Sequence, residues 1–120
     1  MSNYIKHNNN NIPHCIRFQT WRKHFITMDG YCIVCTSPIS ADNFTCGHIV
    51  SKYRGGTLNI NNLEPICVSC NSSMKTQNLY EYKKKLNFPV EYFIKAEERI
   101  NKLIINHLLS KLNNNNSLSV

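Results

Sequence analysis

The sequence predicts a small α+β domain in which two strands and a helix surround a four-cysteine metal site, with an N-terminal helix before this core and a long C-terminal helix after it. The first observation behind this prediction is a pair of Cys-x-x-Cys motifs, at Cys32 and Cys35 and at Cys67 and Cys70. The second is an alternating segment that leads into a Gly-Gly loop, and the third is a sustained helical pattern near the C-terminus. A short run of strands followed by helices favours the α+β class.

The composition favours an anionic partner. At 120 residues the chain has the size of one domain with a modest core. Lysine and arginine number 14 against 7 acidic residues, which gives a formal net charge of +7. Basic side chains gain free energy by releasing counterions from phosphates, so nucleic acid is the first partner class to consider. A charge that serves only solubility is the alternative.

The cysteines indicate metal binding. The chain has no run of about 18 apolar residues, which predicts no transmembrane helix and no membrane partner. Its first residues lack the apolar stretch of a signal peptide. These two absences predict an intracellular protein, and six cysteines in that setting favour metal ligation over disulfides.

The expected organisation has four parts. Residues 1–14 form a flexible arm and residues 113–120 a flexible tail, because each contains or borders an asparagine run without periodicity. Residues 15–86 form the domain that holds both cysteine pairs. Residues 87–112 form a C-terminal helix packed on that domain. The oligomeric state is left open, with a monomer among the options.

Two helices flank the core. Apolar residues at spacings of three and four predict a helix over residues 16–28, ended by Asp29 and Gly30. The residues expected on its core-facing side are Phe18, Trp21, Phe25 and Met28. The same spacing predicts a helix over residues 90–112, with a continuous apolar stripe packed on the core. A dimer through an exposed part of this stripe is the alternative.

Between the flanking helices the pattern is ββ-loop-helix. Residues 44–50 alternate as a strand, and Gly55 and Gly56 supply the loop. Residues 58–66 predict a second strand or extended segment. A helix then begins near residue 70 and continues to between residues 82 and 85, before Asn-Phe-Pro interrupts it at residues 87–89.

The paired cysteines predict a structural zinc site. A Cys-x-x-Cys turn presents two sulfurs to one ion, and two such turns complete a tetrahedral thiolate site. The 31 residues between Cys35 and Cys67 exceed the gap of a simple zinc ribbon, so the site encloses a functional insertion. Cys15 and Cys46 are left over as ordinary thiols, although Cys46 lies two residues from His48.

The insertion carries the candidate catalytic residues. An imidazole such as that of His48 can deprotonate a water for attack on phosphorus. The second cysteine pair leads into Asn71, whose amide oxygen can ligate a hard divalent cation. The ββ-loop-helix arrangement would bring the two side chains into one cleft, as in a nuclease.

Several motifs, in a fixed order along the chain, make this sequence similar to a known family. These motifs are the two Cys-x-x-Cys pairs, Gly47-His48-Ile49, Gly55-Gly56, Asn62-Leu63, Pro65 and Asn71. Over residues 31–78 the sequence resembles the HNH endonucleases, the zinc-stapled ββα-metal (His-Me finger) nucleases. The detailed sequence of these motifs is similar to that of HNH proteins of phages and large DNA viruses. This similarity would place the protein in the cytoplasm or nucleus of a host cell.

The resemblance implies metal-dependent cleavage of DNA phosphodiester bonds by a nuclease domain at residues 15–86. It implies that His48 is the general base and that Asn62 holds the loop that orients this histidine. It also implies that Asn71 is a ligand of a catalytic divalent ion such as Mg²⁺, with Zn²⁺ as the structural metal. Many family members carry Asp or His before the catalytic histidine as a further ligand, whereas this sequence has Gly47. The candidates to replace this ligand are Asp42, Asn43, Glu64 and water.

The DNA contacts expected from the sequence come from Lys52 and Arg54 in the loop and Lys75 on the motif helix. A solvated basic face is the alternative for each. Two other functions compete with cleavage. One is a non-catalytic, zinc-dependent DNA-binding module, favoured by Gly47 and the positive charge. The other is a zinc-stabilised adaptor that binds a protein through residues 90–112.

Overall fold

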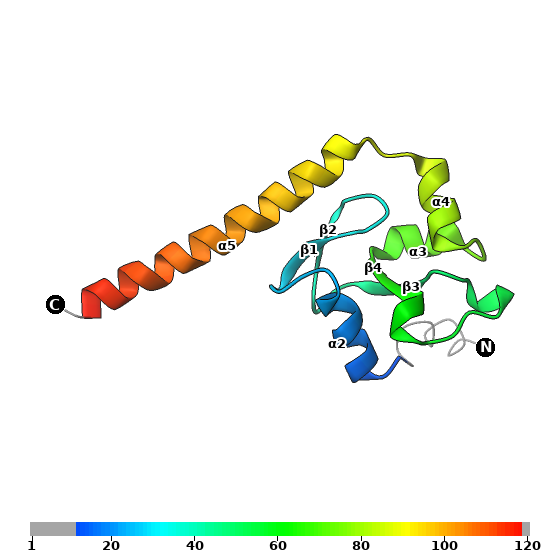
Figure 1. Ribbon diagram of the computed structural model, residues 1–120, viewed down its shortest axis with the longest axis horizontal. Coiled ribbons are helices and arrows are strands. Elements are labelled where there is room, and N and C mark those ends of the chain that lie inside the picture. The colour runs from blue at the N-terminus through cyan, green and yellow to red at the C-terminus, as the bar shows by residue number, and fades with distance from the viewer. Residues whose placement is uncertain (1–11, 119–120) are drawn as a thin grey trace.

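A computed structural model describes residues 12–118 of the protein, with side chains described for residues 12–114 (Figure 1). The asparagine run at residues 8–11 and the last two residues, 119–120, lie outside the described part. Within it, four α-helices accompany two small antiparallel sheets. The predicted α+β class is therefore confirmed.

The centre of the fold is the hairpin of β3 (Thr45–His48) and β4 (Leu63–Ile66). Both strands are shorter than the segments predicted from alternation. The loop between them contains the short 3-10 helices η1 (Lys52–Arg54) and η2 (Ile60–Asn62), so the expected strand at residues 58–62 is a turn. The paired residues are Thr45 and Ile66, Cys46 and Pro65, Gly47 and Glu64, and His48 and Leu63.

A second hairpin, β1 (Asp29–Tyr31) with β2 (Pro38–Ser40), carries the first cysteine pair in its turn. The turn approaches the central hairpin because the Ile33 amide donates to the Pro65 carbonyl of β4 at 3.2 Å. The first cysteine pair is therefore brought to the end of β4, where the second pair begins.

The N-terminal helix α2 (His14–Arg22) ends earlier than its predicted limit at residue 28. Trp21 is buried, and its indole nitrogen donates to the Thr27 carbonyl at 2.8 Å. Phe25 reaches the core from the turn after the helix, whereas Phe18 and Met28 are 61% and 58% exposed. The predicted four-residue core face was wrong in these two, because the chain turns after Arg22 to seat Phe25.

The core gathers apolar residues from both hairpins and three helices. Trp21 contacts Phe25 and Phe44, with ring centroids 4.7 and 4.9 Å apart. The fully buried side chains include Val34, Leu63, Ile66 and Leu79. The two inner cysteines, Cys32 and Cys70, belong to the same cluster, so the metal-binding residues and the apolar core are continuous.

The motif helix is broken, contrary to the single helix predicted for about residues 70–85. The structure has α3 (Val68–Met74) and α4 (Leu79–Leu86), and Lys75 between them has a φ of +54°. Met74 and Leu79 are both buried. The break lets the two helices bury these side chains from different directions. Asn87 then ends α4 in the left-handed conformation, at the predicted interruption.

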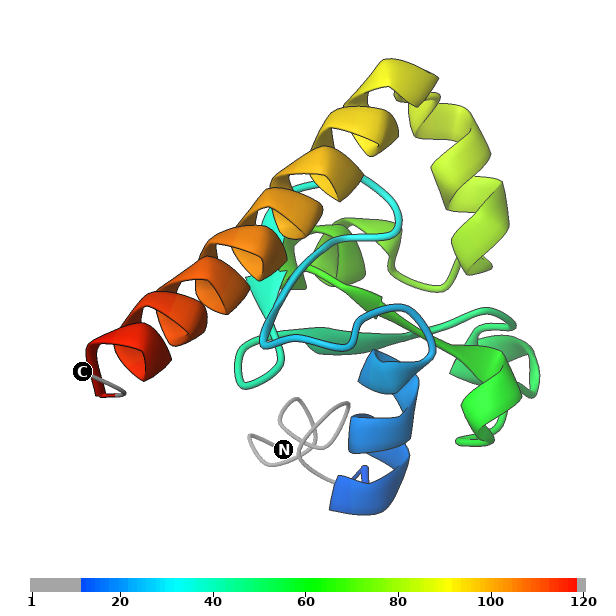
Figure 2. The ribbon, with the colours of Figure 1, turned by 60° about the vertical axis from the view of Figure 1, so that its left-hand side comes forward.

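The last helix, α5 (Val90–Leu118), starts at the predicted residue and continues past the expected end at 112. Figures 1 and 2 show it passing the β1–β2 hairpin and extending beyond the rest of the fold. Its side chains Ala96 and Ile100 are buried, while Leu103 and Leu108 are 42% and 53% exposed. The expected packing of the whole stripe therefore holds only for its first half. No helix within residues 12–118 has the length and apolar character to cross a membrane.

Candidate metal centre and active site

The sulfurs of Cys32, Cys35, Cys67 and Cys70 lie within 4.8 Å of one another. The Cys35 and Cys67 sulfurs are 3.7 Å apart. A tetrahedral ion with Zn–S bonds of about 2.3 Å would separate its sulfurs by about 3.8 Å. The four predicted metal-ligating cysteines therefore come together with the spacing of a tetrahedral site.

Backbone amides hold each cysteine turn. The Cys35 amide donates to the Cys32 sulfur at 3.5 Å, and the Cys70 amide donates to the Cys67 sulfur at 3.4 Å. Cys67 thereby caps the start of α3. Such bonds stabilise negative charge on sulfur, which is the form that binds metal. The local fold is arranged for thiolate ligands.

The surroundings of Cys32 and Cys70 disfavour thiolates without a cation. Burial raises the pKa of the Cys32 thiol to about 12, and burial also raises the pKa of Cys70. At Cys35 burial would raise the thiol pKa, but hydrogen bonds with Ser37 lower it. A divalent cation among the four sulfurs would stabilise their charged form and displace the protons. Four soft sulfur donors within 4.8 Å of one another, two of them on buried residues, fit a metal ion.

His48 is the last residue of β3 and is half-buried. Burial lowers the pKa of its imidazole, and the nearby Lys52 charge lowers this pKa further. Its strand is packed against α3, the helix that carries the half-buried Asn71. The structure therefore places these two predicted site residues on adjoining elements.

The backbone that follows His48 is held by Asn62. The Asn62 side-chain oxygen accepts from the Val50 amide at 2.8 Å, and its side-chain nitrogen donates to the Val50 carbonyl at 3.1 Å and to the Thr57 carbonyl at 2.9 Å. The Ile49 amide donates to the Asn62 carbonyl. One asparagine thus joins both ends of the loop directly after His48.

A second asparagine, which the sequence did not single out, holds the same segment from the other side. The Asn78 side-chain oxygen accepts from the Ser51 amide at 3.0 Å. The neighbouring Leu79 amide donates to the Ile49 carbonyl at 3.0 Å. Asn78 stands just before α4. No sequence signal marked it, because a single helix was predicted through this position.

Both residues of the Gly-Gly loop need to be glycine, Gly55 for its backbone conformation and Gly56 for close packing. Gly55 has a φ of +94°, a conformation that other residues rarely adopt. A Cβ on Gly56 would lie 1.7 Å from the Val50 carbonyl oxygen. Both glycines therefore let the loop fold back on the segment that Asn62 holds.

Gly47 has no room for a side chain. A Cβ there would lie 2.5 Å from Ile66 Cδ1 and 3.1 Å from Leu79 Cδ1, and both of these neighbours are fully buried. The glycine before His48 is thus part of the core packing. The metal ligand that many HNH proteins carry at this position has no space in this fold.

Glu64, opposite Gly47 on β4, is fully engaged elsewhere. Its Oε1 accepts from His24 at 2.8 Å and pairs with the Lys23 ammonium at 3.0 Å, and its Oε2 accepts from the Tyr80 hydroxyl. Burial alone would raise the pKa of Glu64, but these partners lower it to about 2. Glu64 is therefore a poor substitute for the ligand missing at Gly47. Asp42, another candidate, is exposed and accepts a bond from Ser40, and Asn43 is exposed.

The predicted DNA-contacting residues lie around the loop and the motif helix. Lys52 and Arg54 are exposed on η1, and Lys75 is exposed just after α3. The Arg54 guanidinium lies 3.5 Å from Glu81 of α4. Lys52 is close enough to His48 for its charge to act on the imidazole. These three residues thus lie on two segments, η1 and the residue just after α3.

The fold and the cysteine cluster together define a class of protein: a ββα domain with four cysteines that could hold a metal ion. Residues 32–77 match the family model described as HNH endonuclease, so this part of the chain is similar to the HNH endonuclease family. The match contains both cysteine pairs, His48, Asn62 and Asn71. A search of curated proteins and of solved structures found no match.

Proposed function

We propose that the protein is a metal-dependent endonuclease that hydrolyses phosphodiester bonds in DNA, with His48 as the general base. The observation that carries this proposal is the placement of His48. It ends β3 in the family motif, and the backbone after it is bound by Asn62 and by the start of α4. A base held in one orientation can accept a proton from water without reorganisation at each turnover.

The electrostatics of His48 favour the role of a base. The lowered pKa keeps its imidazole neutral at pH 7, and only the neutral ring can accept a proton. The same residue could then release that proton to solvent, because it is half-exposed. Asn62 acts as a positioning residue through the three bonds that its side chain makes.

Two metal ions belong to this proposal. Zn²⁺ would be held by Cys32, Cys35, Cys67 and Cys70 and would be structural, since the site has four protein ligands and no open position. A catalytic divalent ion such as Mg²⁺ would be held by Asn71 and water. Mg²⁺ keeps several waters when bound and needs few protein ligands. Such an ion stabilises charge on the phosphate and on the leaving oxygen.

Lys52, Arg54 and Lys75 would contact the DNA backbone. Each is exposed, and phosphate contacts of this kind give affinity without sequence preference. The net charge of +7 supports the same partner.

A non-catalytic, zinc-dependent DNA-binding module is the second candidate function. The observation that favours it is Gly47, which carries no ligand and has no room for one. Under this alternative the four-cysteine site and the basic residues are retained, and His48 makes no contribution.

A plasmid nicking assay with Mg²⁺ or Mn²⁺ tests the proposal. Wild type should convert supercoiled DNA to nicked or linear forms, and His48→Ala should abolish this conversion. His107→Ala, which alters an exposed histidine on α5, is the matched control and should retain full activity. The rate should rise with pH through a midpoint below the ordinary histidine pKa of about 6.5, because the pKa of His48 is lowered. Equal residual activity in wild type and His48→Ala, with DNA binding intact, would favour the non-catalytic module.

A further inference from the structure

A shallow cavity of about 280 Å³ lies between α4 and the start of α5. Figure 2 shows these two helices as the arms of a V. The cavity contains no residue of the proposed catalytic centre. Its lining residues are Tyr80, Lys83, Lys84, Asn87, Phe88 and Phe93. This set combines aromatic rings with ammonium groups and has no acidic member.

Tyr80 supplies a fixed aromatic surface. Tyr80 is 46% exposed, yet its hydroxyl donates to the carboxylate of the buried Glu64. Burial and the Glu64 carboxylate raise the pKa of this hydroxyl, so it stays a donor. A ring anchored at its far end loses little conformational freedom when a flat ligand stacks on it.

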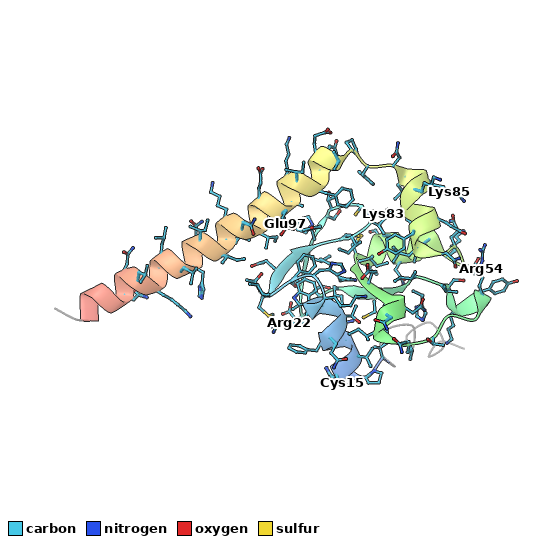
Figure 3. All side chains as sticks on the ribbon, in the orientation of Figure 1. Cys15, Arg22, Arg54, Lys83, Lys85 and Glu97 are labelled. Atoms are coloured by element: carbon cyan, nitrogen blue, oxygen red, sulfur yellow. The ribbon has the colours of Figure 1, made fainter. Side chains whose placement is uncertain are left out.

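The lysines stand beside the rings. The Lys83 ammonium lies 4.7 Å from the centroid of Phe93 and 5.8 Å from that of Tyr80, so it faces the space between α4 and α5. Figure 3 shows Lys83 and Lys85 both on α4. Lys84 is exposed. The nearest acidic residue in sequence, Glu81, is paired with Arg54. Glu81 therefore does not neutralise the positive charge of the lysines at this surface.

Phe88 is presented by the turn that ends α4. Asn87 adopts the left-handed conformation with a φ of +50°, and its amide donates to the Lys83 carbonyl at 3.0 Å. The ring of Phe88 then lies 5.8 Å from that of Tyr92. This turn places an aromatic side chain at the rim of the cavity opposite α4.

The cavity is connected to the loop that follows His48. The start of α4 is bound to this loop by Asn78 and Leu79, and Tyr80 is the next residue. A strand of DNA that reaches His48 would therefore pass close to the cavity. The connection consists of the bond from the Leu79 amide to the Ile49 carbonyl and the bond from the Ser51 amide to the Asn78 side chain, so the two places keep a defined separation.

We propose that this cavity binds one unstacked nucleotide of the DNA substrate. The base would stack on the Tyr80 and Phe88 rings, and Lys84 would contact the adjacent phosphate. The volume lies just below the usual lower limit of about 300 Å³ for small-molecule pockets, which suits one nucleotide and excludes a duplex. Base faces are available for stacking only where the DNA is unpaired.

This inference rests on the proposed function and specifies its substrate. It predicts that the protein prefers DNA with unpaired nucleotides near the scissile bond, such as a flap or a bubble, over a continuous duplex. The contribution of base stacking is sequence-tolerant, because every base has a π-face.

Binding measurements in the His48→Ala background test the inference without cleavage. Fluorescence anisotropy would compare a labelled thymidine oligonucleotide with a duplex of the same length. Phe88→Ala should weaken binding to the single strand by between about 5- and 100-fold, the effect expected for one lost stack, and should change duplex binding less than twofold. Phe18→Ala, which removes an exposed ring on α2, is the matched control and should leave both affinities unchanged.

A pair of Tyr80 variants separates stacking from folding. Tyr80→Phe keeps the ring and should retain single-strand affinity, whereas Tyr80→Ala should lose it. Equal loss in the two variants would assign Tyr80 to stability through Glu64 and overturn the stacking role. Equal effects of Phe88→Ala on both DNAs, or no effect, would also overturn the inference.

The plasmid nicking assay distinguishes this failure from failure of the proposed function. If the wild-type protein nicks plasmids but Phe88→Ala has no selective effect, the endonuclease function stands and the nucleotide site is rejected. If Phe88→Ala weakens single-strand binding but the wild-type protein does not nick plasmids, only the endonuclease function is contradicted.

Discussion

At the scale of single residues, Gly47 and Glu64 are paired across β3 and β4, next to His48. These two residues determine which metal ligands are available beside His48. Gly47 is enclosed by Ile66 and Leu79, so this position serves packing. Glu64 is a buried carboxylate with three partners, two from the turn after α2 and one from α4. Neither residue is available as a metal ligand, so the proposed catalytic ion would depend on Asn71 and water.

Substituting Gly47 should destabilise the protein. Gly47→Ala forces a methyl group against two buried side chains, which typically costs about 1–3 kcal/mol of unfolding free energy. Gly47→Asp should cost more, because it also buries a charge. Urea unfolding measures both. Ser73→Ala, at an exposed position of α3, is the control and should match wild type. A Gly47→Ala protein as stable as wild type would contradict the packing of β3.

Glu64 should make stability depend on acid. Its pKa is about 2 in the folded protein against an ordinary value near 4.5, so the folded state favours the charged form. The resulting stabilisation, roughly 3 kcal/mol, is complete above pH 4.5 and is lost as the pH falls toward 2. Glu64→Gln should therefore be less stable than wild type at pH 7, and this difference should shrink below pH 4.5. Chemical unfolding at several pH values tests this, and a pH-independent difference would contradict it.

At the scale of elements, the fold assembles its candidate active site by binding the segment after His48 from two sides. Asn62 at the end of η2 and Asn78 at the start of α4 bond to consecutive residues of this segment. The break between α3 and α4 is what allows both helices to reach the β3–β4 hairpin. Local helix propensity would have continued one helix through Lys75.

Asn62→Ala should affect both stability and cleavage. The variant leaves the Val50 amide and two carbonyls without their side-chain partner, which should cost about 1–3 kcal/mol of unfolding free energy. Because the loop no longer orients His48, the nicking rate should fall by at least tenfold while DNA affinity changes little. Asn61→Ala, at an exposed neighbouring position, is the control and should match wild type. An unchanged nicking rate in an active Asn62→Ala enzyme would contradict the positioning role.

At the scale of the whole molecule, the four cysteines join the two hairpins and α3 into one body. Cys32 and Cys70 are buried among the core residues, so a metal ion held by the four cysteines would add to the modest apolar core that a chain of this size can build. The described part of the second half of α5 makes no comparable contribution, since Leu108, Leu109 and Leu112 are exposed.

Removing the metal should unfold the domain. Cys67→Ser, or a strong chelator on wild type, should abolish the cooperative thermal transition, because metal binding and folding are coupled. Metal content from elemental analysis should be one zinc per wild-type chain and far less in Cys67→Ser. Cys15→Ser, which alters an exposed cysteine on α2, should keep both the transition and the zinc. A Cys67→Ser protein with unchanged metal content would refute the four-cysteine site.

The sequence by itself was enough to predict the α+β class, the cysteine cluster and the family, because these depend on residue types at short spacings. The cysteines predicted to cluster do so, and the start of α5 was predicted at the correct residue. The assignments of His48, Asn62 and Asn71 stay predictions until cleavage is measured.

Only the tertiary structure decided the features that arise where distant segments meet. Helix α2 ends at Arg22, which lets Phe25 enter the core, and the motif helix is divided at Lys75. The tertiary structure showed why residue 47 is glycine, and it bound Glu64 to partners 16 and 40 residues away. Packing and buried hydrogen bonds between remote residues have no signature in local spacing, so the ligand missing beside His48 could be explained only from the fold.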